Sequence, residues 1–223
     1  GVGLFVVQRR TEPPVSPQAD SEKGRTSSML RQPVVRTLAL FMLAQGVIVG
    51  VIDVASVAFA TAQGQPGMAS VVLSFYALGS CAMGLLFGTL RLQMPLSRQI
   101  VWVGASVAIS ALPLLLASNL TALTLAVLLA GITFGPTITV AMSLVEQQVQ
   151  ANRLTEGMTW LLTGLASGVA LGAAAAGWLI DHWGAQQSFV LTLLAGGAMW
   201  LWGVQAGRQA DRASAPGMRA INM

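Results

Sequence analysis

The sequence predicts an all-α, polytopic membrane protein whose core is a bundle of six transmembrane helices. Three observations lead to this prediction: the composition, six long apolar runs, and the placement of the basic residues. Of the 223 residues, 54% are hydrophobic and only 9% are charged, whereas soluble domains have roughly 25% charged residues. A water-soluble surface is built from charged groups, so this composition argues against a soluble domain. It also excludes intrinsic disorder for most of the chain.

Six runs are long and apolar enough to cross a bilayer, whose core of about 30 Å needs roughly 20 residues of helix. Helices are expected because lipid offers backbone groups no hydrogen-bonding partners, and the runs lack the alternating polarity of a β-barrel. The unit at 37–207 is expected to contain spans at 38–62, 68–90, 100–117, 120–145, 157–180 and 189–207.

The basic residues are sorted to one side of the predicted bundle. All 12 lie before the first span, in the second and fourth loops, or after the sixth span. By the positive-inside rule, this pattern places both ends of the six-span unit in the cytoplasm, with the protein crossing the plasma (inner) membrane. The net charge of +4 is therefore interpreted as a signal of orientation, and no nucleic-acid partner is expected.

The segments outside the spans divide into three parts. Residues 1–7 are apolar but too short to span, and are interpreted as the end of a preceding transmembrane helix. Residues 8–36 are rich in proline, serine and charge, and are expected to form a flexible cytoplasmic linker. Residues 208–223 are expected to form a cytoplasmic tail. The chain is therefore interpreted as the C-terminal fragment of a longer protein, with an intact six-span protein as the alternative.

Small residues recur at a spacing of four in four of the six spans. This spacing places each set on one helix face, and small residues let membrane helices approach closely. These faces are interpreted either as static packing contacts or as faces that slide or rock during transport. Pro136 is expected to kink its helix. The positions assigned to packing or rocking are Gly46, Gly50, Gly84, Gly88, Gly135, Pro136, Gly164, Gly168 and Gly172.

Asp53 is the only charged residue well inside any predicted span. A carboxylate at mid-helix costs about 2.5–3.5 kcal/mol on insertion scales, and such residues usually face a bundle interior or a water-filled cavity. Asp53 shares a helix face with Gly46 and Gly50, so we expect it to be turned toward the small-residue interface. It is interpreted as a proton carrier, as a site for a substrate cation, or as a structural carboxylate hydrogen-bonded to a neighbouring helix. The residues assigned to a transport pathway or proton coupling are Asp53, Gln45, Tyr76 and Thr137.

The sequence contains no recognisable set of catalytic residues. The chain has one His and one Cys, too few for a zinc site built by the protein alone, and it has no nucleotide-binding fingerprint. Neither a metal nor a cofactor is expected, and the protein is predicted not to be an enzyme.

Several motifs together point to a known family. Gly131–Pro136 forms a glycine–proline run in the fourth span, and further motifs occupy the second loop, the fifth span and the loop after it. In this combination the chain resembles the C-terminal half of a major facilitator superfamily (MFS) transporter of the bacterial efflux type. The second loop departs from the family's loop motif because it lacks the acidic residue. The positions that are similar to the family's motifs are Arg91, Arg98, Glu156, Trp160, Asp181 and Gly184.

The resemblance implies a twelve-helix protein in which two six-helix halves alternate access to a central cavity. The six spans would be the seventh to twelfth, with Asp53 facing the cavity. The expected function is secondary active, proton-coupled efflux of small molecules. The alternative is a stand-alone six-helix structural or assembly subunit without transport. The expected partners are a small-molecule substrate, protons, the lipid bilayer and the missing N-terminal six-helix half of the same polypeptide.

Overall fold

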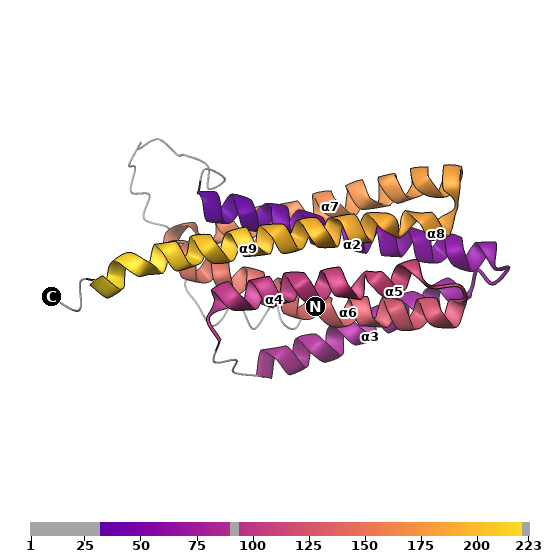
Figure 1. Cartoon of the computed structure of the whole chain (residues 1–223), viewed down its shortest axis with the longest axis horizontal. Helices are drawn as coiled ribbons and strands as arrows, with labels where there is room; N and C mark the ends of the chain where they lie inside the picture. Colours follow the sequence, from indigo (N-terminus) through magenta and orange to yellow (C-terminus); the bar gives the residue numbers. More distant parts are fainter. Residues whose placement is uncertain (1–31, 90–93, 220–223) are drawn as a thin grey trace, which may run out of the picture.

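The described part of the chain is a bundle of long helices (Figure 1). The computed structural model describes residues 32–89 and 94–219, and these ranges contain helices and no strand. Six helical segments within them are long and apolar enough to cross a membrane. The predicted all-α, six-span fold class is therefore confirmed. The expected helix end at 1–7, most of the expected linker at 8–36, and Arg91 lie outside the described residues.

The helices follow the expected spans, with differences at their ends and in the third span. A short 3-10 helix, η2 (Ala151–Arg153), precedes α7. In chain order the α-helices are α2 (Pro33–Ala62), α3 (Met68–Thr89), α4 (Leu96–Ser110), α5 (Leu112–Leu115), α6 (Leu120–Gln148), α7 (Leu154–Trp183), α8 (Ala185–Ser188) and α9 (Val190–Arg219).

Proline accounts for two of these differences. The third span, expected as one run at 100–117, is divided into α4 and α5 at Ala111. Pro113 explains the break, because proline has no N–H to donate and its ring crowds the preceding turn. α2 starts at Pro33 and not at residue 38, since proline fits the first turn of a helix. At the other end of the chain, α9 continues to Arg219, so residues 208–219 of the expected tail are helical.

The largest contact between helices joins α2 and α7. It is a backbone-to-backbone contact, since a Cβ atom added at the α7 glycines would collide with carbonyl oxygens of α2. The residue numbers of the contacting positions increase together along α2 and α7, so the two helices run parallel. The carbonyls of Ala39, Leu43 and Val47 lie against Gly164, Gly168 and Gly172, respectively.

A second parallel pair is formed by α3 and α6. The backbone of Tyr76 lies against Gly131, and the backbone of Gly84 lies against Gly135. α9 then packs along both α2 and α4, and in Figure 1 it runs beside them over the length of the bundle. The bundle thus consists of two pairs of helices in glycine contact, α2 with α7 and α3 with α6. α9 packs on α2, α4 packs on α6, and the contact between α4 and α9 joins the two pairs.

α2 is the central helix of the bundle, and α3 and α7 are peripheral. In the most apolar window of each span, 61% of the α2 residues are buried, against 11% in α3 and 17% in α7. The core around α2 contains Leu38, Phe41, Met42, Ile52, Leu123 and Met199. Broad faces of α3 and α7 are therefore left uncovered in this six-helix unit.

The two ends of the bundle differ in charge. α2 starts and α9 ends at the left of Figure 1, and all the arginines that the structure describes belong to this end, which we call the basic end. They are Arg36, Arg98, Arg153, Arg208, Arg212 and Arg219. At the opposite end, the described connections and the adjoining helix ends, which include Asp181, contain no lysine or arginine.

Candidate functional site

Asp53 lies on an otherwise buried stretch of α2. Between residues 37 and 60, only Asp53 and Val57 are exposed, and every other residue of this stretch is buried or half-buried. No hydrogen bond or ion pair to Asp53 is found among the residues that the structure describes. A carboxylate in the apolar middle of a span therefore projects from the surface of the six-helix unit.

The expectation that Asp53 is turned into the small-residue interface is wrong. Gly46 and Gly50 do lie in that interface, where an added Cβ would collide with the carbonyl oxygens of Leu165 and Val169 on α7. A contact this close leaves no room for any side chain. Asp53 is instead exposed at the edge of the contact.

Tyr76 of α3 is the second residue assigned to the pathway. Its ring packs on Phe134 of α6, with centroids 5.9 Å apart. Its hydroxyl oxygen is buried and has no hydrogen-bond partner in the described part of the chain. Of the four residues assigned to the pathway, Asp53 is therefore charged and exposed, and Tyr76 has a buried hydroxyl.

Gln45 and Thr137, the other two pathway residues, lie in the packed interior. Gln45 is 1% exposed and Thr137 is 0% exposed. The Thr137 hydroxyl donates to the carbonyl of Thr133 at 2.6 Å, so its polar group is satisfied by its own helix. The Oε1 atom of Gln45 has no partner among the described residues. In this conformation neither side chain lines an open surface.

Ser56 is a polar residue that the sequence analysis missed. It lies three residues after Asp53 on α2, is fully buried, and its hydroxyl has no hydrogen-bond partner in the described ranges. Its position close to Asp53 on one helix was the available signal. Most buried polar groups in native proteins are hydrogen-bonded. The unpartnered atoms of Gln45, Ser56 and Tyr76 can therefore accept a water molecule, a polar group of a ligand, or a new partner after a conformational change.

The glycine positions fall into different classes. Gly46, Gly50, Gly164, Gly168 and Gly172 form the α2–α7 contact, and Gly135 meets the backbone of α3. A Cβ added at Gly84 would meet only the Gly135 Cα, at 3.8 Å, and a Cβ added at Gly88 would meet no described atom within 4 Å. The expectation that Gly88 packs against a neighbouring helix therefore finds no contact in the described unit. α6 continues through the buried Pro136 without a break.

The remaining motif positions lie toward the two ends of the bundle. Arg98 is exposed in the first turn of α4, and Glu156 pairs with Arg153 at 2.9 Å near the start of α7. Trp160 is half-buried against the core. At the opposite end Asp181 is exposed, and Gly184 terminates α7 with φ of 91°, a left-handed conformation that favours glycine. These residues lie near helix ends, whereas Asp53 lies in mid-span.

Tyr76→Phe tests whether the Tyr76 hydroxyl stabilises the fold. The variant keeps the ring that packs on Phe134 and removes an oxygen that is buried without a described partner. A buried polar group without a partner costs about 1–3 kcal/mol, so we expect a Tm equal to or above that of the parent protein. Thermal unfolding of both purified proteins in detergent measures this. A clearly lower Tm would show that the hydroxyl is bonded, for example to water, in the native protein.

The site has no feature of a metal centre. Among the residues described, no group of three or more His, Cys, Asp and Glu side chains lies close enough to hold a metal ion. What the arrangement offers is a single mid-span carboxylate with polar atoms beside it on α2 and α3. Such an arrangement can bind a cationic or hydrogen-bonding group, or hold and release a proton.

One comparison relates this helical bundle to a known protein family. A family model described as Major Facilitator Superfamily matches residues 37–219. The matched range begins in the first turns of α2 and ends with the last residue of α9, so it takes in all six spans and the Asp53 site. A search of curated proteins found no match.

Proposed function

Since the chain belongs to the Major Facilitator Superfamily, a family of membrane transporters, we propose that it forms the C-terminal half of a proton-coupled exporter. In this proposal the whole protein has twelve spans and moves small, amphipathic molecules outward by alternating access. The family does not favour the alternative of a structural subunit without transport.

The observation that carries the proposal is the exposed carboxylate of Asp53 in the apolar middle of α2. A charge at this depth costs about 2.5–3.5 kcal/mol if it must be accommodated by the helix centre. Water in a cavity lowers that cost, and lipid does not. Asp53 therefore faces a central cavity in the complete transporter, and the second half of the protein forms the other wall.

A single proton on Asp53 supplies enough energy for export. Moving one charge through 100 mV is worth about 2.3 kcal/mol, which corresponds to about a fiftyfold concentration ratio of an uncharged substrate. Asp53 takes up a proton from the outer side and releases it to the inner side, while the substrate moves in the opposite direction.

The missing N-terminal half covers the uncovered faces of α3 and α7. One face of α7 consists only of small residues, all exposed in the six-helix unit. Small residues let a second membrane helix approach closely, so this face fits a helix of the other half better than it fits lipid. The face is formed by Thr155, Thr159, Thr163, Ala166, Ala170 and Ala174.

The orientation in this proposal follows from the basic end. Arg98, Arg153 and Arg208 lie at the end where α2 starts, and the opposite end has no described lysine or arginine. The positive-inside rule places the basic end in the cytoplasm. The protein is then an inner-membrane transporter with both ends of its six-span unit in the cytoplasm.

Proteoliposomes test the proposed function. The full-length protein is reconstituted with a pH-sensitive dye inside the vesicles, and a panel of uncharged and cationic amphipathic solutes is added one at a time. We expect at least one solute to cause proton movement that is absent from empty vesicles. Vesicles that contain only residues 1–223 are the control, and they should show none because they lack half of the cavity. Full-length vesicles without solute-dependent proton movement would argue for an uncoupled transporter or for a different ion.

A further inference from the structure

The outward face of α9 has a hollow whose lining changes from apolar to basic along the helix. One row of exposed or half-buried residues, spaced three or four apart, follows this face. The row consists of Val190, Leu194, Gly197, Leu201, Gln205, Arg208 and Arg212. The described residues that line the hollow are Trp200, Leu201, Trp202, Val204, Gln205 and Arg208. The face is therefore apolar over its first three turns and polar over its last two.

The change from apolar to basic falls at the level of the lipid headgroups. α9 has 30 residues, or about 45 Å of helix, whereas the core of a bilayer is about 30 Å thick and takes about 20 residues. Counted from Val190, the core ends near Arg208. The neighbouring helix supports this level, because a Cβ added at Gly104 of α4 would lie 3.2 Å from the Trp200 Cα. Trp102 and Trp200 thus lie at similar depths, and tryptophans concentrate at the headgroup boundary.

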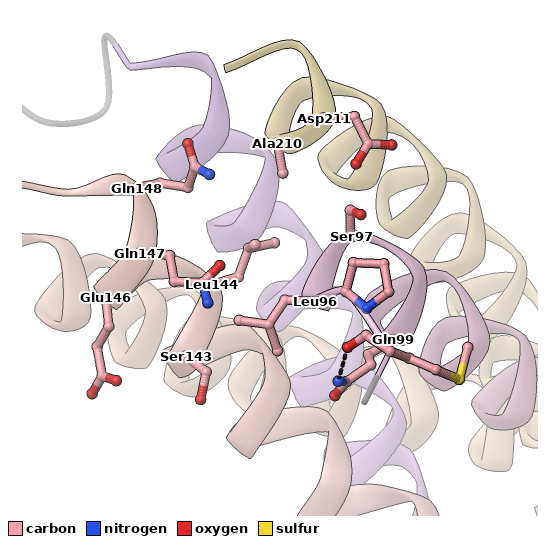
Figure 2. Close-up of a pocket in the computed structure, with 12 residues that line it drawn as sticks. Leu96, Ser97, Gln99, Ser143, Leu144, Glu146, Gln147, Gln148, Ala210 and Asp211 are labelled. Atoms are coloured by element: carbon pink, nitrogen blue, oxygen red, sulfur yellow. Dashed lines mark hydrogen bonds between the residues drawn. The ribbon is translucent and has the colours of Figure 1, made fainter. Parts of the chain in front are cut away.

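The two arginines of this face are available to bind an anion. Arg208 and Arg212 are exposed one turn apart, and neither has a hydrogen bond or ion pair in the described ranges. The acidic residue nearest to them in sequence, Asp211, lines a separate cavity at the ends of α4, α6 and α9 (Figure 2). The cavity and the hollow share no lining residue. Guanidinium groups match the geometry of phosphate oxygens, so this end of the face suits a phosphate.

The apolar part of the same face suits an acyl chain. Gly197 has no side chain, and a Cβ added there would meet no described atom within 4 Å. It therefore leaves a notch between Leu194 and Leu201, which are 65% and 63% exposed. Between the notch and the arginines, the Gln205 amide and the two indole N–H groups of the hollow are hydrogen-bond donors, and lipid ester carbonyls are acceptors.

We propose that this face of α9 binds one anionic phospholipid, with its phosphate on Arg208 and Arg212 and an acyl chain in the notch at Gly197. A second copy of the chain fits the face less well, since a symmetric contact would bring the arginines of the two copies together. The site is separate from Asp53, and binding does not depend on proton coupling. Only the leaflet, which is the cytoplasmic one, rests on the orientation given under the proposed function. The bound lipid fixes the height of α9 in the membrane.

Native mass spectrometry of the full-length protein tests this proposal. Delipidated protein in detergent is titrated with phosphatidylglycerol or with phosphatidylcholine, and the bound lipids are counted. We expect tighter binding of phosphatidylglycerol, and in Arg208→Gln a Kd for it about fivefold higher, the contribution of one basic residue near an anionic headgroup.

Arg98→Gln is the matched control. Arg98 is also exposed, and it lies at the level of Arg208 because a Cβ added at Gly207 would collide with the Ser97 carbonyl. Its removal should leave the affinity for the first phosphatidylglycerol unchanged. Equal weakening by the two substitutions would show that only general charge attraction acts, and equal affinities for the two lipids would exclude an anionic site. Either result would overturn the proposal.

Two further measurements test the notch. Gly197→Leu fills it without changing the charge and should weaken binding of phosphatidylglycerol, whereas Gly177→Leu, at another glycine with open space, should not. In the parent protein, phosphatidylglycerol with a diazirine in its acyl chain should cross-link to residues 194–205, a result that needs no variant to fold. Cross-links spread evenly over the six spans, or a dimer that forms through α9 without lipid, would contradict the proposed site.

Discussion

Replacing Asp53 with asparagine is expected to abolish proton-driven transport and leave the protein folded. Asparagine has nearly the same shape as aspartate but cannot carry a proton between the two sides. A single coupled proton at 100 mV sustains about a fiftyfold concentration ratio of an uncharged substrate, and in Asp53→Asn this ratio should fall to one. Uptake of substrate into inverted membrane vesicles with an imposed proton gradient measures the ratio directly.

The stability of Asp53→Asn should be unchanged or higher. Asp53 is exposed and has no described hydrogen bond or ion pair to lose, and removing a mid-span charge lowers the cost of insertion. A Tm below that of the parent would instead support the structural interpretation, in which the carboxylate bonds to another helix. Loss of coupling together with an unchanged Tm would exclude simple misfolding.

Two control variants test whether the effect is due to the carboxylate of Asp53 or to any polar change on the exposed part of α2. Asp53→Glu keeps a carboxylate and should retain part of the gradient. Val57→Asn changes the other exposed residue of this stretch of α2 and should leave the gradient intact. Exchange of labelled for unlabelled substrate, without a gradient, should persist in Asp53→Asn because it needs no net proton movement. If Asp53→Asn still accumulates substrate against its gradient, Asp53 has no part in coupling.

The fold was predictable because it depends on local composition. Long apolar runs and the sorting of basic residues are properties of contiguous segments, and they led to the six spans confirmed in the structure. The break of the third span at Ala111 is a local effect of Pro113. The end of α9 was harder to place, because a helix satisfies its own backbone groups and need not stop where its apolar run stops.

The candidate site was less predictable because it depends on which helices meet. On an ideal helical wheel Asp53 lies close to Gly46 and Gly50, and the sequence has no information on where the partner helix ends its contact. Gly84 and Gly88 have the same spacing as the glycines of α7, yet Gly88 meets no described atom. The missing partners of the Ser56 and Tyr76 hydroxyls likewise depend on contacts between segments that are distant in sequence.

Gly168→Ala is expected to destabilise the bundle more than a single methyl group would elsewhere on α7. A Cβ at this position would collide with the Leu43 carbonyl and lie 3.0 Å from the Gly46 Cα. Both neighbours are backbone atoms of α2 and cannot change rotamer, so the two helices must separate. Overpacking of this kind costs about 1–3 kcal/mol, and for a protein of this size we expect a Tm lower by roughly 2–12 °C.

Gly177→Ala is the matched control for this prediction. It adds the same methyl group to the same helix at a position where an added Cβ meets no described atom within 4 Å. Alanine is a better helix former than glycine by about 0.5–1 kcal/mol, so the Tm of Gly177→Ala should be equal or slightly higher. The two substitutions thus have opposite expected signs in one helix. Equal Tm values for both variants would show that α2 and α7 are not in backbone contact, and would favour a pair that slides or rocks over one that moves as a rigid unit.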